Sequence, residues 1–196
     1  MLGKLFAKQT ATQSTFVVAQ LNDRAEPMDR GELYEDPLIE VLQKHRAGEV
    51  VGGGTMLGEN KEIKFCDIEI EVREPIAKNI ELIKQTLEEL GAPKGSKLRL
   101  LDQDEELSIG KNEGLAVYLN GTDLPDDVYA ECDANFVYSE FNRLLEGAGM
   151  VHSHWQGPTE TALYMYGPSF ETMKKRLADF LGTYPLCQRA RILQIA

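Results

Sequence analysis

The sequence predicts an α+β protein made of two similar halves, each with an antiparallel sheet and two helices. The first observation behind this prediction is an internal repeat of long period. In each half a strand-like run ends in Leu-Asn, a proline follows five residues after the asparagine, and an aspartate follows two residues later. These pairs keep one spacing of 98 positions: Asn22 and Asn120, Pro27 and Pro125, Asp29 and Asp127.

The two halves also end alike. Leu90-Gly91 leads through a proline to Arg-Leu-Leu, and Leu181-Gly182 leads through a proline to Arg-Ile-Leu. Agreement at both ends, in the same order, indicates a duplicated domain.

The first half reads as strand, helix, strand, strand, helix, strand. Its expected strands are residues 16–21, 50–57, 63–72 and 97–101, with a turn at 58–61. Asp36 is expected to cap the first helix, with Pro37 at its first position and Gly48 at its end. The second helix is expected to start at Pro75 and to end at Gly91. One apolar face recurs along it: Ile76, Ile80, Ile83, Leu87 and Leu90.

The second half repeats this order. Its expected strands are residues 115–119, 151–155, 161–166 and 189–195, and the middle two form a hairpin around Gly157-Pro158. Asp133 and Ser169 are expected to cap the two helices. The inward faces of these helices are Val137, Phe141, Leu144 and Leu145, and Phe170, Met173, Leu177, Phe180 and Leu181.

A βαββαβ unit with right-handed crossovers is the ferredoxin-like fold, an antiparallel sheet with both helices on one face. The prediction is therefore a tandem pair of ferredoxin-like domains, at residues 14–101 and 114–196. Residues 1–13 are expected to be a flexible N-terminal arm, and residues 102–113 an acidic linker.

Composition limits the classes of function. The chain has 196 residues, of which 42% are hydrophobic and 27% charged, so disordered and fibrous classes are excluded. A net charge of −11 disfavours nucleic acid as a partner. No apolar run approaches the roughly 20 residues of a membrane-spanning helix. Three separated cysteines without a CxxC motif, and a start without a signal-peptide pattern, favour a cytoplasmic protein.

His152 and His154 form the one candidate metal pair, because their i, i+2 spacing on a strand would place both rings on one side of the sheet. No third ligand stands nearby, and two packed or solvated histidines are the alternative. No Gly-x-Ser-x-Gly motif is present, so we assign no catalytic residue, metal or cofactor. The run Gly52-Gly53-Gly54 lies inside a strand and predicts a bulge or a close backbone approach rather than a phosphate loop.

Two strand faces are candidates for partner binding. Asp67, Glu69 and Glu71 alternate with apolar residues and would line the open face of the first sheet, as a solvated face or as a surface for a basic partner. Aromatic residues take the matching place in the second half: Tyr118, Trp155, Tyr164 and Tyr166. They resemble the stacking platform of RNA-recognition domains, but the negative charge favours packing between the halves or a protein-binding surface.

The long connections at residues 22–36 and 120–133 are candidate ligand loops. Asn22, Asp29, Asn120 and Asp127 lie in them. Their position resembles that at which ACT-type domains, a ferredoxin-like family, bind amino acids. The alternative is that Asn and Asp form turns that proline makes rigid.

We therefore expect a non-enzymatic, bacterial-type cytoplasmic protein that binds a protein partner through acidic and aromatic residues. Inhibitors and toxin-neutralising immunity proteins are examples of such a role. One alternative is a small-molecule sensor that uses the strand-to-helix loops, for which a homodimer would be suitable. The other is a metal-dependent enzyme centred on His152 and His154.

Overall fold

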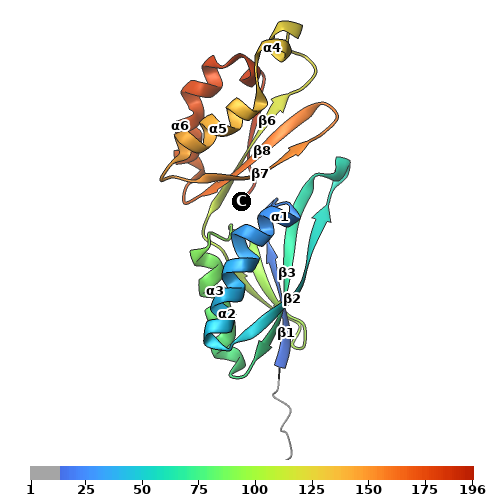
Figure 1. The fold of residues 1–196 in the computed structure, drawn as a ribbon, viewed down its shortest axis with the longest axis vertical. Coiled ribbons are helices and arrows are strands. Elements are labelled where there is room, and N and C mark those ends of the chain that lie inside the picture. The colour runs from blue at the N-terminus through green and yellow to red at the C-terminus, as the bar shows by residue number, and fades with distance from the viewer. Residues whose placement is uncertain (1–13) are drawn as a thin grey trace, which may run out of the picture.

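The computed structural model describes residues 14–196, and the arm expected at residues 1–13 lies outside them. Two lobes follow one another along the long axis, and each is a sheet with helices packed against it (Figure 1). No helix among the described residues is both long and apolar enough to cross a membrane.

The first sheet has five antiparallel strands in the order β2-β3-β1-β4-β5. They are β1 (Ser14–Leu21), β2 (Gly48–Leu57), β3 (Ile63–Arg73), β4 (Ser96–Leu100) and β5 (Glu105–Ile109). The second sheet has the order β7-β8-β6-β9 and is also antiparallel. Its strands are β6 (Glu113–Asn120), β7 (Met150–Gln156), β8 (Glu160–Gly167) and β9 (Arg191–Gln194). In both sheets the βαββαβ strands stand in the same order, so the predicted tandem ferredoxin-like fold is confirmed.

Helices cover one face of each sheet. In the first half these are α2 (Asp36–His45) and α3 (Ile76–Glu89), and in the second α5 (Ala134–Leu145) and α6 (Phe170–Thr183). Alternate residues of β1 and β6 point into the two cores, because successive side chains of a strand face opposite sides of the sheet. Asp133 and Ser169 cap α5 and α6 as expected: each side chain accepts a backbone N–H of the first turn.

The first helix begins earlier than the sequence suggests. Helix α1 (Pro27–Arg30) continues through one π-helical turn at Gly31–Glu35 into α2. The prediction that Asp36 caps this helix is wrong, because Asp36 has helical φ and ψ of −60° and −49° and its N–H donates to the carbonyl of Gly31. The π turn shifts the 3.6-residue period and so hides the helix start. At the other end Arg46, with φ 54°, ends α2, and the expected stop at Gly48 is the first residue of β2.

Two segments that were expected to be irregular form regular structure. Strand β5 lies within residues 102–113, the expected linker, and pairs with β4 because Leu107 and Ile109 pack against the first core. A short helix, α4 (Asp126–Glu131), lies in the second strand-to-helix connection, where α1 lies in the first. The proline of the repeat therefore marks the start of a short helix in both halves.

The glycine run of β2 allows a close approach, as predicted. The register of β2 against β3 shifts between Val50 and Gly52, which is a bulge. A Cβ on Gly53 would lie 2.8 Å from a carboxylate oxygen of Glu35 and 2.9 Å from the guanidinium of Arg30. Arg30 pairs with Glu35 and donates to the carbonyl of Gly54 at 2.9 Å. The glycines thus let the π turn pack against the edge strand.

Gly110, where the chain passes from the first sheet to the second, is expected to tolerate no side chain. Its φ is +96°, and a Cβ there would lie 1.9 Å from the carbonyl oxygen of Pro93. Gly110→Ala should lower the free energy of unfolding by about 3 kcal/mol or more, because backbone strain and a backbone clash add together. Denaturant titration measures the loss. The control is Gly147→Ala, with φ +74° and no atom within 4 Å of a Cβ, which should cost about 1–2 kcal/mol. Equal losses in both variants would contradict the clash.

Candidate functional site

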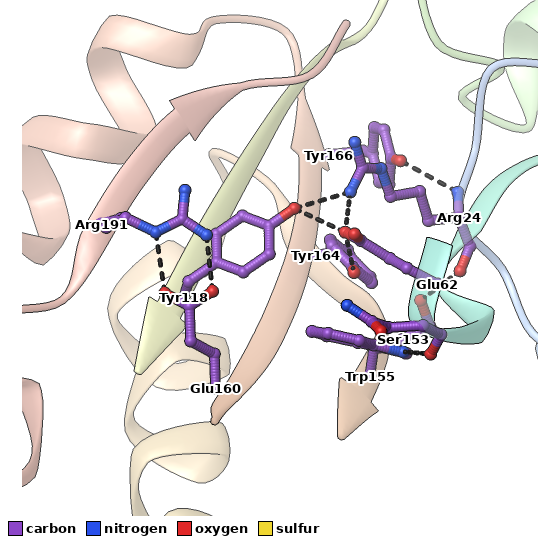
Figure 2. Close-up of polar contacts among 10 residues, drawn as sticks. Arg24, Glu62, Tyr118, Ser153, Trp155, Glu160, Tyr164, Tyr166 and Arg191 are labelled. Carbon is purple, nitrogen blue, oxygen red and sulfur yellow. Dashed lines mark hydrogen bonds and ion pairs between the residues drawn. The ribbon is translucent and has the colours of Figure 1, made fainter. Parts of the chain in front are cut away.

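The open face of the second sheet, the face without helices, is covered by the first half of the chain. Tyr118, Tyr164 and Tyr166 on this face are 4%, 0% and 1% exposed. Figure 2 shows these rings beside Arg24 and Glu62, which come from the first half. The three tyrosines are therefore not available to a partner, and the expectation of an aromatic binding surface is corrected to packing between the halves. Trp155 lies at the edge of this face and is half-buried.

Glu62 is the centre of the contact between the halves. Its Oε1 atom accepts hydrogen bonds from the hydroxyls of Tyr118 at 2.6 Å and Tyr164 at 2.7 Å (Figure 2). Arg24 forms an ion pair with the same carboxylate, donates to the hydroxyl of Tyr118 at 2.7 Å, and lies over the ring of Tyr164. Burial, and then the hydrogen bond to Glu62, raise the pKa of Tyr164 well above its ordinary value. The site thus holds one half-buried negative charge between one cation and two neutral hydroxyls.

The backbone of Arg24 is fixed from the second half as well. Its N–H donates to the hydroxyl of Tyr166 at 3.0 Å, and its carbonyl accepts from the hydroxyl of Ser153 at 2.7 Å. On the far side of Tyr118, Arg191 stacks 4.3 Å from the ring centroid and makes two hydrogen bonds to Glu160 (Figure 2). The contacts of Arg24 thus join the first connection of the chain to strands β6, β7 and β8 of the second sheet.

The two candidate metal histidines lie in different surroundings. The register of β7 against β8 shifts between Val151 and Ser153, so a bulge at His152 breaks the alternation on which the prediction relied. His152 is buried, and its Nδ1 lies 2.7 Å from Asp23, which also accepts the hydroxyl of Tyr34 at 2.6 Å. His154 is exposed. Within residues 14–196 no group of three or more His, Cys, Asp or Glu side chains is arranged to hold a metal ion.

Two cavities flank His154 in the groove between the halves. One, of about 340 Å³, lies between the β2–β3 hairpin and strands β7 and β8, and Trp155 and Tyr164 line it. The other, of about 350 Å³, reaches Asp29 on α1 and Tyr138 on α5. Burial, and then the charge of Glu26, raise the pKa of Asp29, while the charge of His154 lowers it. Both cavities are lined by residues of both halves.

The acidic strand lies on the open face of the first sheet, as its alternation predicted. Asp67 lies 3.6 Å from Arg99, whereas Glu69 is exposed and Glu71 is half-buried. No cation lies within 4 Å of Glu69 or Glu71 in the part of the chain that the structure describes. Within residues 14–196 these two carboxylates are charges without a partner.

The four loop candidates are not brought together. Asn22 donates to the carbonyls of Lys94 and Ile195, and Asp29 lines the groove. The side chain of Asn120 accepts two backbone N–H groups of its own loop, and that of Asp127 accepts the N–H of Val128. Turn formation, the alternative interpretation of these loops, describes Asn120 and Asp127. Asp29 lines the groove between the halves, and Asn120 lines a separate cavity of about 200 Å³ in the second half.

Sequence reasoning missed Asp23, Arg24 and Glu62. A signal for the first two exists in the repeat, since the spacing of 98 places Gly121 and Thr122 at the positions of Asp23 and Arg24. Both copies have the Leu-Asn pair, but charged residues follow it only in the first copy. This difference indicates that the charged residues serve a function that the second copy does not share.

No protein-family model and no curated protein matches the chain. Similar solved structures include the first two RRM domains of yeast poly(U) binding protein, with 13% identity over 94% of this chain and 99% of that chain, and a TM-score of 0.24. Another is the regulatory subunit of aspartate kinase from Thermus thermophilus, with 10% identity over 87% of this chain and 97% of that chain, and a TM-score of 0.27. A third is a mutant chlorite dismutase from Candidatus Nitrospira defluvii, with 9% identity, coverages of 94% and 91%, and a TM-score of 0.31. Because these TM-scores lie below 0.5, the fold class rests on the strand order of the two sheets.

Removal of the central carboxylate is expected to loosen the contact between the halves. Glu62→Ala leaves two buried hydroxyls and Arg24 without their acceptor, so the free energy of unfolding should fall by about 1–3 kcal/mol. Denaturant titration measures this loss, and small-angle scattering should show a larger radius of gyration. The control is Glu160→Ala, which removes a carboxylate from the more exposed pair with Arg191 and should cost less than about 1 kcal/mol. Equal effects of the two variants would contradict a central role of Glu62.

The buried tyrosines predict a loss of stability at high pH. Burial raises the pKa of Tyr118, Tyr164 and Tyr166 above the ordinary 10.0. The folded protein holds these protons more tightly than the unfolded chain, so this contribution is complete below pH 10.0 and decreases as the pH rises further. The denaturation midpoint, measured between about pH 8 and pH 11, should therefore fall at the alkaline end. Tyr166→Phe should make the fall smaller, and Tyr138→Phe, on the exposed side of α5, should leave it unchanged.

Proposed function

We propose that the protein works by binding, and that its partner is a protein with basic and apolar groups that meets the open face of the first sheet. The observation that carries the proposal is the difference between the two open faces. The open face of the second sheet is buried between the halves, whereas no helix of residues 14–196 covers the open face of the first sheet (Figure 1).

The charges of this face are unbalanced. Lys97 pairs with Glu106 at 2.8 Å and Arg99 with Asp67 at 3.6 Å, while Arg73 pairs with Glu49. Glu69 and Glu71 remain as a local excess of two negative charges, in a chain whose net charge is −11. Such an excess steers a basic partner toward the face and penalises an acidic one.

Apolar groups stand beside these carboxylates. Phe16, opposite Glu71 in the register of β1 and β3, is 47% exposed, and Leu101 beyond the end of β4 is 58% exposed. Exposed aromatic and aliphatic side chains next to unpaired charges are typical of a protein-binding surface. Phe16 thus supplies an aromatic group for the binding surface, a role that the sequence analysis gave to the tyrosines. An inhibitor or immunity role in the cytoplasm is compatible with such a surface and is part of the proposal.

The test is reversal of the two unpaired charges. Glu69→Lys with Glu71→Lys should weaken capture of the partner from a lysate of the encoding organism more than tenfold, because like charges placed opposite one another cost several kcal/mol. Quantitative mass spectrometry of the captured proteins measures this, and far-ultraviolet circular dichroism confirms that the variant is folded.

The matched control makes the same change of charge on the second half. Glu131 and Glu146 are exposed there, and Glu131→Lys with Glu146→Lys should leave capture unchanged. A partner retained equally by both double variants, or no protein captured by the unchanged chain, would overturn the proposal.

A further inference from the structure

The cavity of about 340 Å³ between the β2–β3 hairpin and the second sheet has mainly apolar walls from both halves. Leu57 and Ile63 come from the hairpin, and Trp155 and Tyr164 come from β7 and β8. Its volume lies within the range of roughly 300–1,000 Å³ that small-molecule sites have, and such sites are frequent at the boundary between domains. The indole of Trp155 opposite these two aliphatic side chains favours a planar, apolar ligand.

The ring of Trp155 is held in place as part of this wall. Its indole N–H donates to the carbonyl of Asn60 at 3.2 Å, and the hydroxyl of Tyr164 is bound to Glu62. The indole of Trp155 is therefore fixed by a contact between the halves, which lowers the entropic cost of binding a ligand against it.

Three polar side chains line the same cavity: Glu26, Lys61 and His154. In residues 14–196 no carboxylate lies within 4 Å of Lys61, and no side-chain hydrogen bond engages the imidazole of His154. Two nitrogen groups without a partner thus stand against a single carboxylate. This excess of nitrogen groups over carboxylates favours a ligand with an acidic end over one with a basic end.

We propose that this cavity binds a small aromatic carboxylate, with its ring against Trp155 and Leu57 and its carboxylate toward Lys61 and His154. The site lies in the groove between the halves and not on the open face of the first sheet, so it stands independently of the proposed protein partner. Glu26 opposes the ligand charge and limits the affinity.

Trp155 is the one tryptophan of the chain, so its fluorescence reports occupancy of this cavity directly. The probes are phenylpropionate, phenylpropanamide and phenylpropylamine, which share the ring and carbon chain and differ in charge at the end. The acid is expected to give a saturable change of emission at the lowest concentration, the amide at a higher one and the amine at the highest. The absence of a saturable change with the acid up to its solubility limit, or an amine that binds as tightly as the acid, would overturn the proposal.

Three variants with exposed substitution sites test the assigned charges. Lys61→Met should weaken binding of phenylpropionate about two- to fivefold, the factor that an exposed ion pair contributes. Glu26→Gln should tighten it by a similar factor, because the opposing charge is removed. Lys64→Met, on the same hairpin but outside this cavity, should leave the affinity unchanged. Equal affinities of the Lys61 and Lys64 variants would overturn the assignment.

Discussion

The carboxylate of Glu62 accepts hydrogen bonds from Tyr118 and Tyr164 of the second half while it pairs with Arg24 of its own half. A phenol hydroxyl that is buried without an acceptor costs free energy, so the second sheet can be covered only by a surface that supplies one. The tip of the β2–β3 hairpin supplies it, and Arg24 neutralises the charge that results. The relative position of the halves depends on this arrangement, because two further polar contacts of the second sheet, from Tyr166 and Ser153, hold the backbone of that same arginine.

Two copies of one fold therefore present different surfaces. A symmetric pair could bury both open faces against each other, but here the hairpin of the first half covers the open face of the second, and the lobes lie end to end (Figure 1). The first open face keeps its own charges, Glu69 and Glu71 among them. The hairpin that crosses to the second lobe also leaves a groove beside Trp155, which it does not fill. One contact thus produces both candidate sites of the molecule.

The sequence predicts most of the fold because the information for it is local. The caps at Asp133 and Ser169, the apolar face of α3 and the alternation on β3 each act within a few residues. The start of the first helix was missed because a π turn interrupts its period, and β5 was missed because Leu107 and Ile109 stand in an otherwise acidic segment. The prediction that His152 and His154 share a face was wrong for the same kind of reason. One bulge at His152 reverses the face of the residues of β7 that precede it.

The contact between the halves could not be predicted from local sequence patterns. Arg24, Glu62 and Tyr164 are far apart in the chain, and each alone resembles an ordinary surface or core residue. The repeat nevertheless separates them from the scaffold. Residues that both copies keep, such as Pro27 and Pro125, act locally and start short helices. Residues that only one copy has, such as Asp23 and Arg24 against Gly121 and Thr122, bind the other half.

Asn22 and Asn120 show that even a shared residue can diverge: the first bonds to the carbonyl of Ile195 in the second half, and the second bonds within its own loop. In a duplicated chain, identity between copies indicates fold, and difference between copies indicates the interface that makes the pair asymmetric.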